Sequence, residues 1–429
     1  MKKLKLHWQI LIAIGLAVIA GLSTSPDTKI LGISPFYIYE FLGTLFLNGL
    51  KMIIVPLIVS SIIVGVSGIS NDKALGELGG KTIGYYFMSS LVAIMIGLLV
   101  VNITQPGIID GEPAKDRLAL SDIDDSVRDK VEGKDSSDIA EVFIRMVPPN
   151  IVEAAAENQM LGLIFFALLF GYFMMKTEKP LRETLFNFWQ GVFETMMKIT
   201  LFVMKFAPLG VFGLVAKTVA STGFDAFKPL LIFFFTVAIA LAIHMFVALP
   251  IVLSKLGGVS PKRHFNAMSP AILTAFSTAS SSATLPLTMD CVEKKAGVSK
   301  RTTSFVLPLG ATINMDGTAL YECVAAMFIA QAYGMNLDLA TQFTIVLVAL
   351  LTSIGVAGIP AASLVAISII LGTIGLPLEA VGLILVTDRI LDMCRTAVNV
   401  FSDSCAAVVI GKSQGEEQIL TEASTKNTA

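Results

Sequence analysis

Long apolar runs, separated by short polar segments, follow one another along most of the chain. The continuous runs cover residues 8–23, 38–66, 82–103, 158–175, 185–219 and 229–254, and a more broken apolar region extends from 265 to 411. A helix needs about 20 predominantly apolar residues to cross a bilayer, so these runs predict membrane-spanning helices. We therefore expect an all-α polytopic membrane protein, with the lipid bilayer as its main solvent.

The composition agrees with a membrane protein and narrows the choice of partners. Of the 429 residues, 54% are hydrophobic and 15% are charged, whereas a soluble domain has about 25% charged residues. The net charge of -2 argues against a nucleic-acid partner, because such proteins carry a basic excess. The four cysteines lie in or beside apolar segments without CxxC spacing, so no disulfide or zinc framework follows.

Charged residues at the ends of the runs predict the orientation. If the first span begins inside and the spans alternate, the lysines at these ends lie on one side: they stand at 2, 3, 5, 73, 81, 176, 179, 255, 262, 294, 295, 300 and 412. This side is the cytoplasm by the positive-inside rule. We expect a multi-pass protein of the cell (inner) membrane with both termini cytoplasmic. The run from Trp8 to Leu22 is its expected first span, and residues 105–139 its external loop.

Two apolar stretches are too interrupted to cross the membrane singly. Residues 277–284 form a Ser-rich tip between short apolar arms, and residues 355–360 form a Gly/Pro-rich tip in the same setting. Arms of about 10 to 14 residues favour re-entrant helical hairpins, the first entering from the cytoplasm and the second from outside. Two opposed broken elements are typical of an inverted-repeat transporter, because non-helical backbone at membrane depth must be buried in protein or line a cavity. The alternative is a pair of ordinary kinked helices.

The last apolar run carries a stripe of charged and polar residues. The stripe contains Asp388, Arg389, Asp392, Arg395, Asn399 and Asp403. All but Arg389 fall on a helical face about 80° wide, and this face must be buried because charges facing lipid are costly. An ion-pair ladder to a neighbouring helix is the alternative. It explains Arg389 with Asp388 but leaves a surplus of three carboxylates, which suggests that mobile cations complete the stripe.

The preceding apolar run contains a second polar motif, Asn-Met-Asp-Gly-Thr at residues 314–318. Asn, Asp and Gly weaken helix propensity, so the motif predicts an unwound turn inside the segment. Such a turn offers backbone carbonyls and the Asp316 carboxylate, the oxygen ligands that a hard cation prefers. Upstream, Tyr86, Ser89 and Ser90 have i, i+3, i+4 spacing and therefore share one helical face.

Three motifs together resemble the glutamate transporter family, also called the dicarboxylate/amino acid:cation symporters. They are the 314–318 motif, the Ser-Ser-Ser-Ala-Thr-Leu-Pro tip at 280–286 and the run from Asp388 to Asn399. The similarity covers nearly the whole chain. It implies eight transmembrane helices, two opposed re-entrant hairpins, inverted repeats and a homotrimer. It also implies an elevator, in which a transport domain moves against a fixed scaffold and the second hairpin is the gate.

The resemblance assigns residue ranges to these parts. The scaffold would consist of 1–66 and 140–222, and the transport domain of 81–104 and 227–412. The smaller elements would be hairpin 1 at about 262–296, hairpin 2 at about 340–374, the last span at about 379–411 and a cytoplasmic tail at 413–429.

The resemblance further implies an acidic amino acid, L-glutamate or L-aspartate, as substrate. Asp392 would hold its amino group and Arg395 its side-chain carboxylate, by a bidentate pair. The remaining contacts would come from Ser281, Thr318, Ile359, Thr396 and Asn399. Relatives that carry neutral amino acids have a smaller, uncharged residue at the Arg395 position, and C4-dicarboxylate carriers lack the acid matching Asp392. A cation-coupled C4-dicarboxylate transporter of the same fold and a proton-only glutamate symporter are the alternatives.

Sodium ions are the implied co-substrates, and no resident cofactor is expected. The first sodium site would use Gly310, Asn314, Asn399 and Asp403. The second would use Tyr86, Ser89, Ser90, Asn314 and Asp316, and the third would use backbone at Thr312, Ser353 and Ile354. The chain departs from archaeal relatives at Ala279, Val356 and Ser363, the last two near the third site.

Glu322 is the candidate proton carrier. Animal excitatory amino acid transporters, which use protons, have a glutamate at the matching position, whereas archaeal sodium-only members have a glutamine. The alternative is a permanently protonated or hydrogen-bonded Glu322 without a transport role. An intramembrane protease is disfavoured, because His7, His244 and His264 stand far from the Ser-rich tip and form no HExxH motif. We therefore expect a transporter and not an enzyme.

Overall fold

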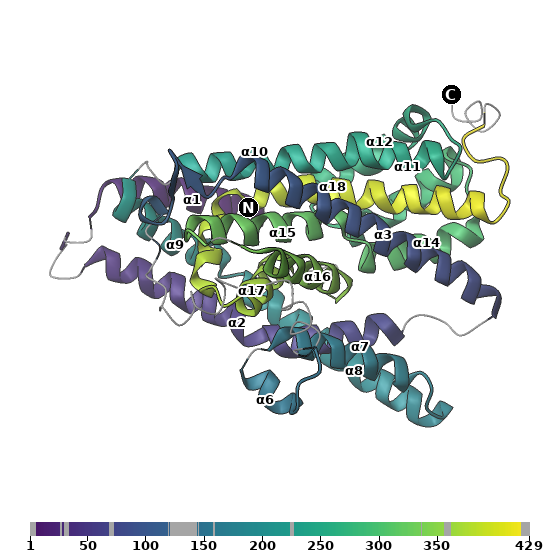
Figure 1. The fold of residues 1–429 in the computed structure, drawn as a ribbon, viewed down its shortest axis with the longest axis horizontal. Helices are drawn as coiled ribbons and strands as arrows, with labels where there is room; N and C mark the ends of the chain where they lie inside the picture. The colour runs from purple at the N-terminus through teal and green to yellow at the C-terminus, as the bar shows by residue number, and fades with distance from the viewer. Residues whose placement is uncertain are drawn as a thin grey trace, which may run out of the picture.

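A computed structural model gives the fold. It describes residues 6–25, 28–29, 34–67, 73–118, 120, 144, 146–157, 159–223, 227–335, 337–355 and 362–421. Within these ranges the chain is helical almost throughout (Figure 1). The expectation of an all-α protein is therefore confirmed, apart from one short β-hairpin that follows the third helix.

The elements follow in chain order. The first half contains α1 (Leu6–Leu22), α2 (Pro35–Ser67), α3 (Lys73–Thr104), β1 (Ile108–Ile109), β2 (Glu112–Pro113), η1 (Asp116–Leu118), α6 (Ile151–Ala156), α7 (Met160–Met174), α8 (Lys179–Met204) and α9 (Ala207–Thr222). The second half contains α10 (Phe227–Ile243), η4 (His244–Ala248), α11 (Leu249–Lys255), α12 (Pro261–Thr278), α13 (Ser281–Asp290), η5 (Cys291–Lys295), α14 (Lys300–Ile313), α15 (Asp316–Ala332), α16 (Leu339–Gly355), α17 (Ala362–Thr373), η6 (Leu378–Ala380) and α18 (Val381–Ser413). β1 and β2 are antiparallel, with Ile108 opposite Pro113 and Ile109 opposite Glu112.

Two groups of helices can be distinguished by their packing. In the first group, α2 packs against α7, α8 and α9, and α1 packs against α9. In the second group, α18 packs against α10, α12, α14 and α15, while α15 also packs against α3, α16 and α17. Figure 1 shows α3, α10, α12 and α18 side by side along the long axis, with α2, α7 and α8 on the other side of α16 and α17.

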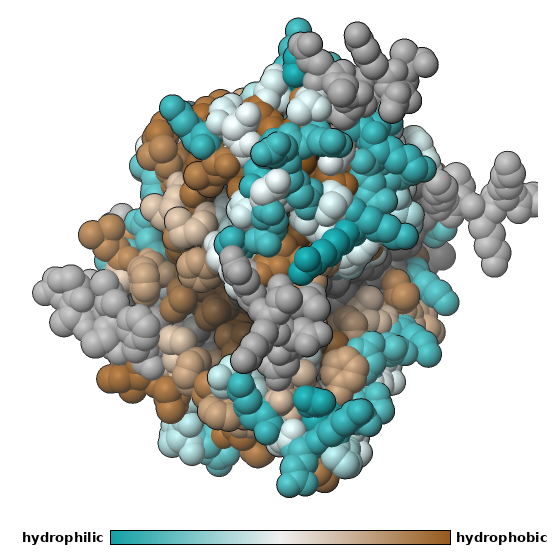
Figure 2. Space-filling view, turned by 90° about the vertical axis from the view of Figure 1, so that its right-hand side faces the viewer, coloured by the Kyte–Doolittle hydropathy of each residue, from teal (hydrophilic) through white to brown (hydrophobic). Residues whose placement is uncertain are grey.

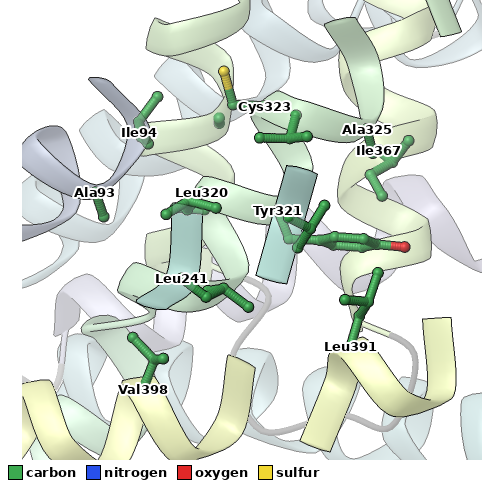
Figure 3. Close-up of a cluster of buried hydrophobic side chains, with 14 of the residues drawn as sticks. Ala93, Ile94, Leu241, Leu320, Tyr321, Cys323, Ala325, Ile367, Leu391 and Val398 are labelled. Carbon is green, nitrogen blue, oxygen red and sulfur yellow. The ribbon is translucent and has the colours of Figure 1, made fainter. Parts of the chain in front are cut away.

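The core of the second group is built around α15. Every residue of this helix except Thr318 is buried, which is typical of a helix surrounded by other helices on all faces. Figure 3 shows Leu320 and Tyr321 of α15 among apolar side chains from α3, α10, α17 and α18. Polar side chains at the start of α15, such as Asp316, are therefore buried inside protein.

The apolar surface fits a membrane environment. Among the described residues, three helices are long and apolar enough to cross a bilayer: Leu78–Thr104, Phe227–Lys255 and Val381–Ser413. The bent pair Lys179–Val203 and Ala207–Ser221 adds a fourth if it forms one span, and shorter apolar helices include Trp8–Leu22 and Gly162–Met174. Figure 2 shows hydrophilic residues gathered on the end of the molecule where α18 ends, with hydrophobic residues along one flank. These features support a polytopic membrane protein, whereas the count of eight spans stays a prediction.

The first expected hairpin contains a helix break where the sequence predicts one. Ala279 ends α12 in the left-handed conformation (φ 47°), and the hydroxyl of Ser280 accepts a hydrogen bond from the Ala283 amide, which caps α13. The predicted second tip lies between α16 and α17, and its residues 356–361 are outside the described residues. In each pair the two helices pack against each other. Their insertion from opposite sides of the membrane stays a prediction.

The beginning of the C-terminal tail is docked on the start of α14. Glu416 accepts hydrogen bonds from the Ser299 amide (2.7 Å), the Ser299 hydroxyl (2.6 Å) and the Thr302 hydroxyl (2.6 Å). Leu420 is buried, and its amide donates to the Ala296 carbonyl. Partial burial works to raise the pKa of Glu416, but the bonds from Ser299 and Thr302 outweigh it and hold the pKa below the usual value.

We call the contacts of Glu416 with Ser299 and Thr302 the tail clasp. We expect Glu416→Gln to lower the free energy of opening the tail clasp by about 1 kcal/mol, because charge-assisted hydrogen bonds at the start of a helix are lost. Since the folded-state pKa of Glu416 is lowered, the carboxylate stabilises the clasp above the usual glutamate pKa, and this stabilisation is lost as the pH falls through the lowered value. Hydrogen exchange of the Ser299 and Leu420 amides measures the effect. Glu417→Gln, which changes the exposed neighbouring side chain, is the control, and equal exchange in both variants would contradict the clasp.

Candidate functional site

The motif at 314–318 interrupts a helix, as the sequence predicts. α14 ends at Ile313 and α15 begins at Asp316, and the two residues between them have non-helical backbone angles, with φ/ψ of -93°/87° at Asn314 and -116°/55° at Met315. The break places Asp316 in the first turn of α15, where the helix dipole favours a negative charge. It also aims the side chains of Asn314 and Asp316 at α18 and α3.

Asp316 is fully buried and is held by hydrogen bonds from three other helical segments. Its Oδ1 accepts from Ser90 of α3 at 2.8 Å, and its Oδ2 accepts from Ser402 of α18 at 2.6 Å and from Ser89 of α3. The Nε2 atom of His244 lies 3.0 Å from the same Oδ2. The donors are hydroxyl groups and one imidazole, with no lysine or arginine among these contacts.

A second oxygen cluster lies beside the first, around Asn314 and Asp403. The Nδ2 atom of Asn314 donates to Asp403 Oδ1 at 2.9 Å and to Ser402 Oγ at 3.1 Å, while its buried Oδ1 has no hydrogen-bond partner in the described part of the chain. A methyl group at Gly310 would lie 2.5 Å from Asp403 Oδ1 and 2.8 Å from the Tyr86 hydroxyl. Only glycine lets the backbone approach this closely.

Arg395 is the centre of the charged stripe. It is 1% exposed, and its Nη2 donates to Asp388 and to Asp392, both at 3.0 Å. Its guanidinium carbon stands 3.9 Å above the ring of Tyr321, a cation–π contact that supports a desolvated arginine. The Nε and Nη1 donors of Arg395 are buried without a hydrogen-bond partner among the described residues. A buried guanidinium with two unused donors can bind a carboxylate.

The ion pairs of the stripe differ from the expected ladder. Arg389 donates to Asp392 at 3.2 Å and not to Asp388, because adjacent residues on a helix point in different directions. Asp388 is instead seven residues from its partner Arg395, nearly two turns away on the same face. The expected surplus of three unpaired carboxylates is therefore too large: Asp388 and Asp392 are paired with arginine, whereas Asp403 accepts a hydrogen bond from the neutral amide of Asn314.

Close packing of α15 on α18 brings the other expected substrate contacts together. Asn399 Oδ1 accepts from the Gly317 amide at 2.8 Å, and its Nδ2 donates to Thr318 Oγ1 at 3.1 Å. A methyl group at Gly317 would lie 2.7 Å from the Arg395 carbonyl oxygen, so glycine is required for this approach. Thr396 lies three residues before Asn399 on α18, and its hydroxyl donates to the Asp392 carbonyl at 2.8 Å.

Two further expected site residues lie on neighbouring elements. Ser281 is buried at the start of α13, which packs against α18. Glu322 is fully buried on α15; its Oε2 accepts from Thr352 of α16 at 3.1 Å, and its Oε1 has no hydrogen-bond partner in the described ranges. Ile359 and the side chains of Thr312, Ser353 and Ile354 lie outside what the structure describes. The backbone that the predicted third sodium site would use belongs to α14 at Thr312 and to α16 at Ser353 and Ile354, and these two helices pack against each other.

His244 and Ser402 belong to the site, although sequence reasoning did not assign them. His244 stands in a long apolar run, where a lone histidine is the only signal, and Ser402 stands one residue before Asp403 on the same stripe. The described residues contain no group of three His, Cys, Asp or Glu side chains that could hold a metal ion. The oxygen atoms gathered here come from the carboxylates of Asp316 and Asp403, from serine hydroxyls and from the Asn314 amide, and oxygen ligands of this kind suit a hard cation more than a transition metal.

The fold and the site define a class: a helical membrane protein whose charged and polar groups converge on a helix break inside a buried core, as in secondary transporters. Within this class, the chain belongs to the sodium:dicarboxylate symporter family, whose model matches residues 6–413. The resemblance inferred from the motifs is thereby confirmed, and the family is one of transporters and not of enzymes.

Curated relatives cover nearly the whole chain. It is 39% identical over 416 residues to a proton/sodium-glutamate symport protein of Bacillus caldotenax, covering 97% of this chain and 96% of the relative. It is 38% identical over 419 residues to a proton/glutamate-aspartate symporter of Escherichia coli K12, covering 96% and 93%. It is also 35% identical over 459 residues to the human excitatory amino acid transporter 3, covering 96% and 87%.

Proposed function

We propose that this protein is a secondary active symporter that takes up acidic amino acids, glutamate and aspartate, together with sodium ions. The observation that carries the proposal is Arg395, which is buried next to Asp392 with two donors that have no hydrogen-bond partner in the described part of the chain. A guanidinium and a carboxylate side by side match the carboxylate and the amino group of an acidic amino acid. The names of the relatives, which are glutamate symporters, support the same substrate class.

The substrate would bind between α18 and the two hairpin tips. Its side-chain carboxylate would take the Nε and Nη1 donors of Arg395, and its amino group would bind Asp392. The α-carboxylate would be held by Asn399 and Thr318, with further contacts from Ser281, Ile359 and Thr396. Asp392 accepts one bond from Arg389 on Oδ2 and one from Arg395 on Oδ1, so its carboxylate still has acceptor positions for an amino group.

The two oxygen clusters would bind sodium as a co-substrate. The buried Oδ1 of Asn314 and the Asp403 carboxylate, with Gly310 and Asn399, would form one site, and Asp316 with Ser89, Ser90 and Tyr86 the other. Each sodium ion would neutralise one buried carboxylate that has no arginine or lysine bonded to it among the described contacts. A third ion would use backbone at Thr312, Ser353 and Ile354.

Several cations per cycle are needed for useful accumulation. Glutamate with two sodium ions moves one net positive charge inward, which gains about 2.3 kcal/mol per 100 mV. Two tenfold sodium gradients add about 2.8 kcal/mol. The total of about 5 kcal/mol supports an internal glutamate concentration about a thousand to ten thousand times the external one. The first group of helices would be the scaffold of a homotrimer, and the second group an elevator that carries the site across the membrane. The α16–α17 pair would be its gate.

Uptake into proteoliposomes tests this function. Labelled glutamate, aspartate and succinate would be offered with sodium, proton and potassium gradients imposed separately. We expect sodium-driven uptake of both amino acids and none of succinate. Uptake of succinate without uptake of glutamate or aspartate would establish the C4-dicarboxylate alternative. Glutamate uptake driven by a proton gradient in the absence of sodium would establish the proton-only alternative.

Glu322 would carry a proton with the substrate. It is buried with one carboxyl oxygen bonded to Thr352 and the other without a partner in the described ranges, an arrangement that is costly for an ionised group. We expect Glu322→Gln to abolish internal acidification during uptake while sodium-driven glutamate exchange continues. A pH-sensitive dye inside the liposomes measures the proton flux. Thr352→Val, which removes only the bonded hydroxyl, is the control, and an unchanged flux in Glu322→Gln would contradict the role.

A further inference from the structure

His244 and Ser402 are contacts of Asp316 to which neither the motifs nor the proposed function gives a role, and His244 is the one of the two that is not a hydroxyl. The side chains of His244 and Asp316 are 1% and 0% exposed, and the Nε2–Oδ2 distance is 3.0 Å. His244 opens the π-helical turn η4 between α10 and α11, where the Leu249 amide bonds to the His244 carbonyl. Such turns insert an extra residue into a helix and are frequent at functional sites.

The donors that surround Asp316 are of two chemical kinds. Ser89, Ser90 and Ser402 are hydroxyls, which donate a hydrogen bond to the carboxylate and also have lone pairs that a cation can take. His244 is different, because the Nε2 that faces a carboxylate is assigned the proton and then has no lone pair to offer. Its Nδ1 has no hydrogen-bond partner among the described residues, so the Asp316 contact is the imidazole's one polar attachment there.

We propose that His244 is a positioning residue for sodium binding, which holds Asp316 by the hydrogen bond that persists when a cation takes the serine oxygens. This inference rests on the proposed function, in which Asp316, Ser89 and Ser90 bind sodium. Four donors share the carboxylate. A lone pair of Ser89 or Ser90 that points at a bound ion restricts the directions in which the same hydroxyl can donate, so its bond to Asp316 weakens.

The bond from His244 therefore matters more with sodium bound than without it. Removing it should cost more free energy in the bound state, and the difference appears as weaker sodium affinity. A hydrogen bond to a charged group contributes enough that losing part of it changes an equilibrium about tenfold. The substrate contacts at Arg395 and Asp392 lie elsewhere on α18 and should keep their affinity once sodium is saturating.

The test compares His244→Leu, which removes the donor, with His244→Gln, which keeps an N–H group of similar reach. We expect His244→Leu to raise the sodium concentration for half-maximal glutamate uptake about tenfold, with glutamate affinity at saturating sodium unchanged. His244→Gln should stay within about threefold of the parent. The sodium-induced shift in Tm, measured in detergent without substrate, should shrink in the same order and can be read even if the leucine variant transports poorly.

His264→Leu is the matched control. His264 of α12 is fully buried and bonds through Nε2 to Ser404 of α18 at 2.9 Å, and its Nδ1 has no hydrogen-bond partner among the described residues. It should lower the Tm and leave the sodium dependence unchanged. Unchanged sodium dependence in His244→Leu, or equal shifts in both leucine variants, would overturn the proposed role of His244 and leave the proposed function standing. A parent protein without any sodium dependence would overturn the proposed function and this inference with it.

Discussion

Arg395→Lys is expected to reduce the affinity for glutamate and aspartate about 100-fold or more. Lysine keeps the positive charge beside Asp388 and Asp392, so the ion pairs that stabilise α18 are largely retained. It lacks the planar fork whose Nε and Nη1 donors are aimed away from those partners. Losing one member of a buried, hydrogen-bonded charge pair costs about 2 to 5 kcal/mol, and a lysine restores only part of it.

Measuring half-saturation for glutamate, and competition by neutral amino acids, checks this expectation. Arg389→Lys is the control, because Arg389 bonds to the same Asp392 at 3.2 Å but is 19% exposed. We expect that variant to change glutamate affinity less than tenfold. An Arg395→Lys protein with the parent's affinity would mean that the carboxylate of the substrate binds somewhere else.

Asp316→Asn has the second largest expected effect: loss of sodium-driven uptake by about two orders of magnitude. The asparagine is nearly isosteric, but it removes the charge that a sodium ion would neutralise. It also places an amide donor against hydroxyls that donate to the Asp316 carboxylate in the parent protein, those of Ser89, Ser90 and Ser402. Both changes act on sodium binding and leave Arg395 and its partners in place.

Sodium titration of uptake, together with binding of labelled sodium in detergent, measures this loss. Ser90→Ala is the graded control, because it removes a single donor at 2.8 Å and keeps the charge. It should raise the half-saturating sodium concentration only a few-fold. If Asp316→Asn kept the parent's sodium dependence, the oxygen cluster around Asp316 would have a structural role only.

Local features of the chain were predictable because they depend on neighbours in sequence. The break at 314–318 follows from weak helix propensity, and the turn after Thr278 follows from a Ser-rich tip that can cap the next helix. The stripe on α18 follows from helical periodicity, and the structure buries its residues from Arg395 to Asp403 as the cost of exposed charge requires. The family resemblance rested on these same segments.

Pairing between side chains was less predictable. Arg389 pairs with Asp392 and not with Asp388 because of the directions in which side chains leave a helix. The polarity pattern alone does not give these directions. The contacts of Asp316 with Ser402 and His244 join segments 86 and 72 residues away. The docking of Glu416 on α14 spans 117 residues to Ser299, and no local pattern marks it.

The amino-acid sequence by itself determined where apolar helices form, where two of them break and which face of the last helix must avoid lipid. These properties follow from propensity, periodicity and the cost of placing charge in hydrocarbon. Only the tertiary structure decided which donors meet each buried carboxylate, because helices from distant parts of the chain pack around α15 and α18. A partner chosen by packing has no fixed separation in sequence, and for this reason His244 became visible only in three dimensions.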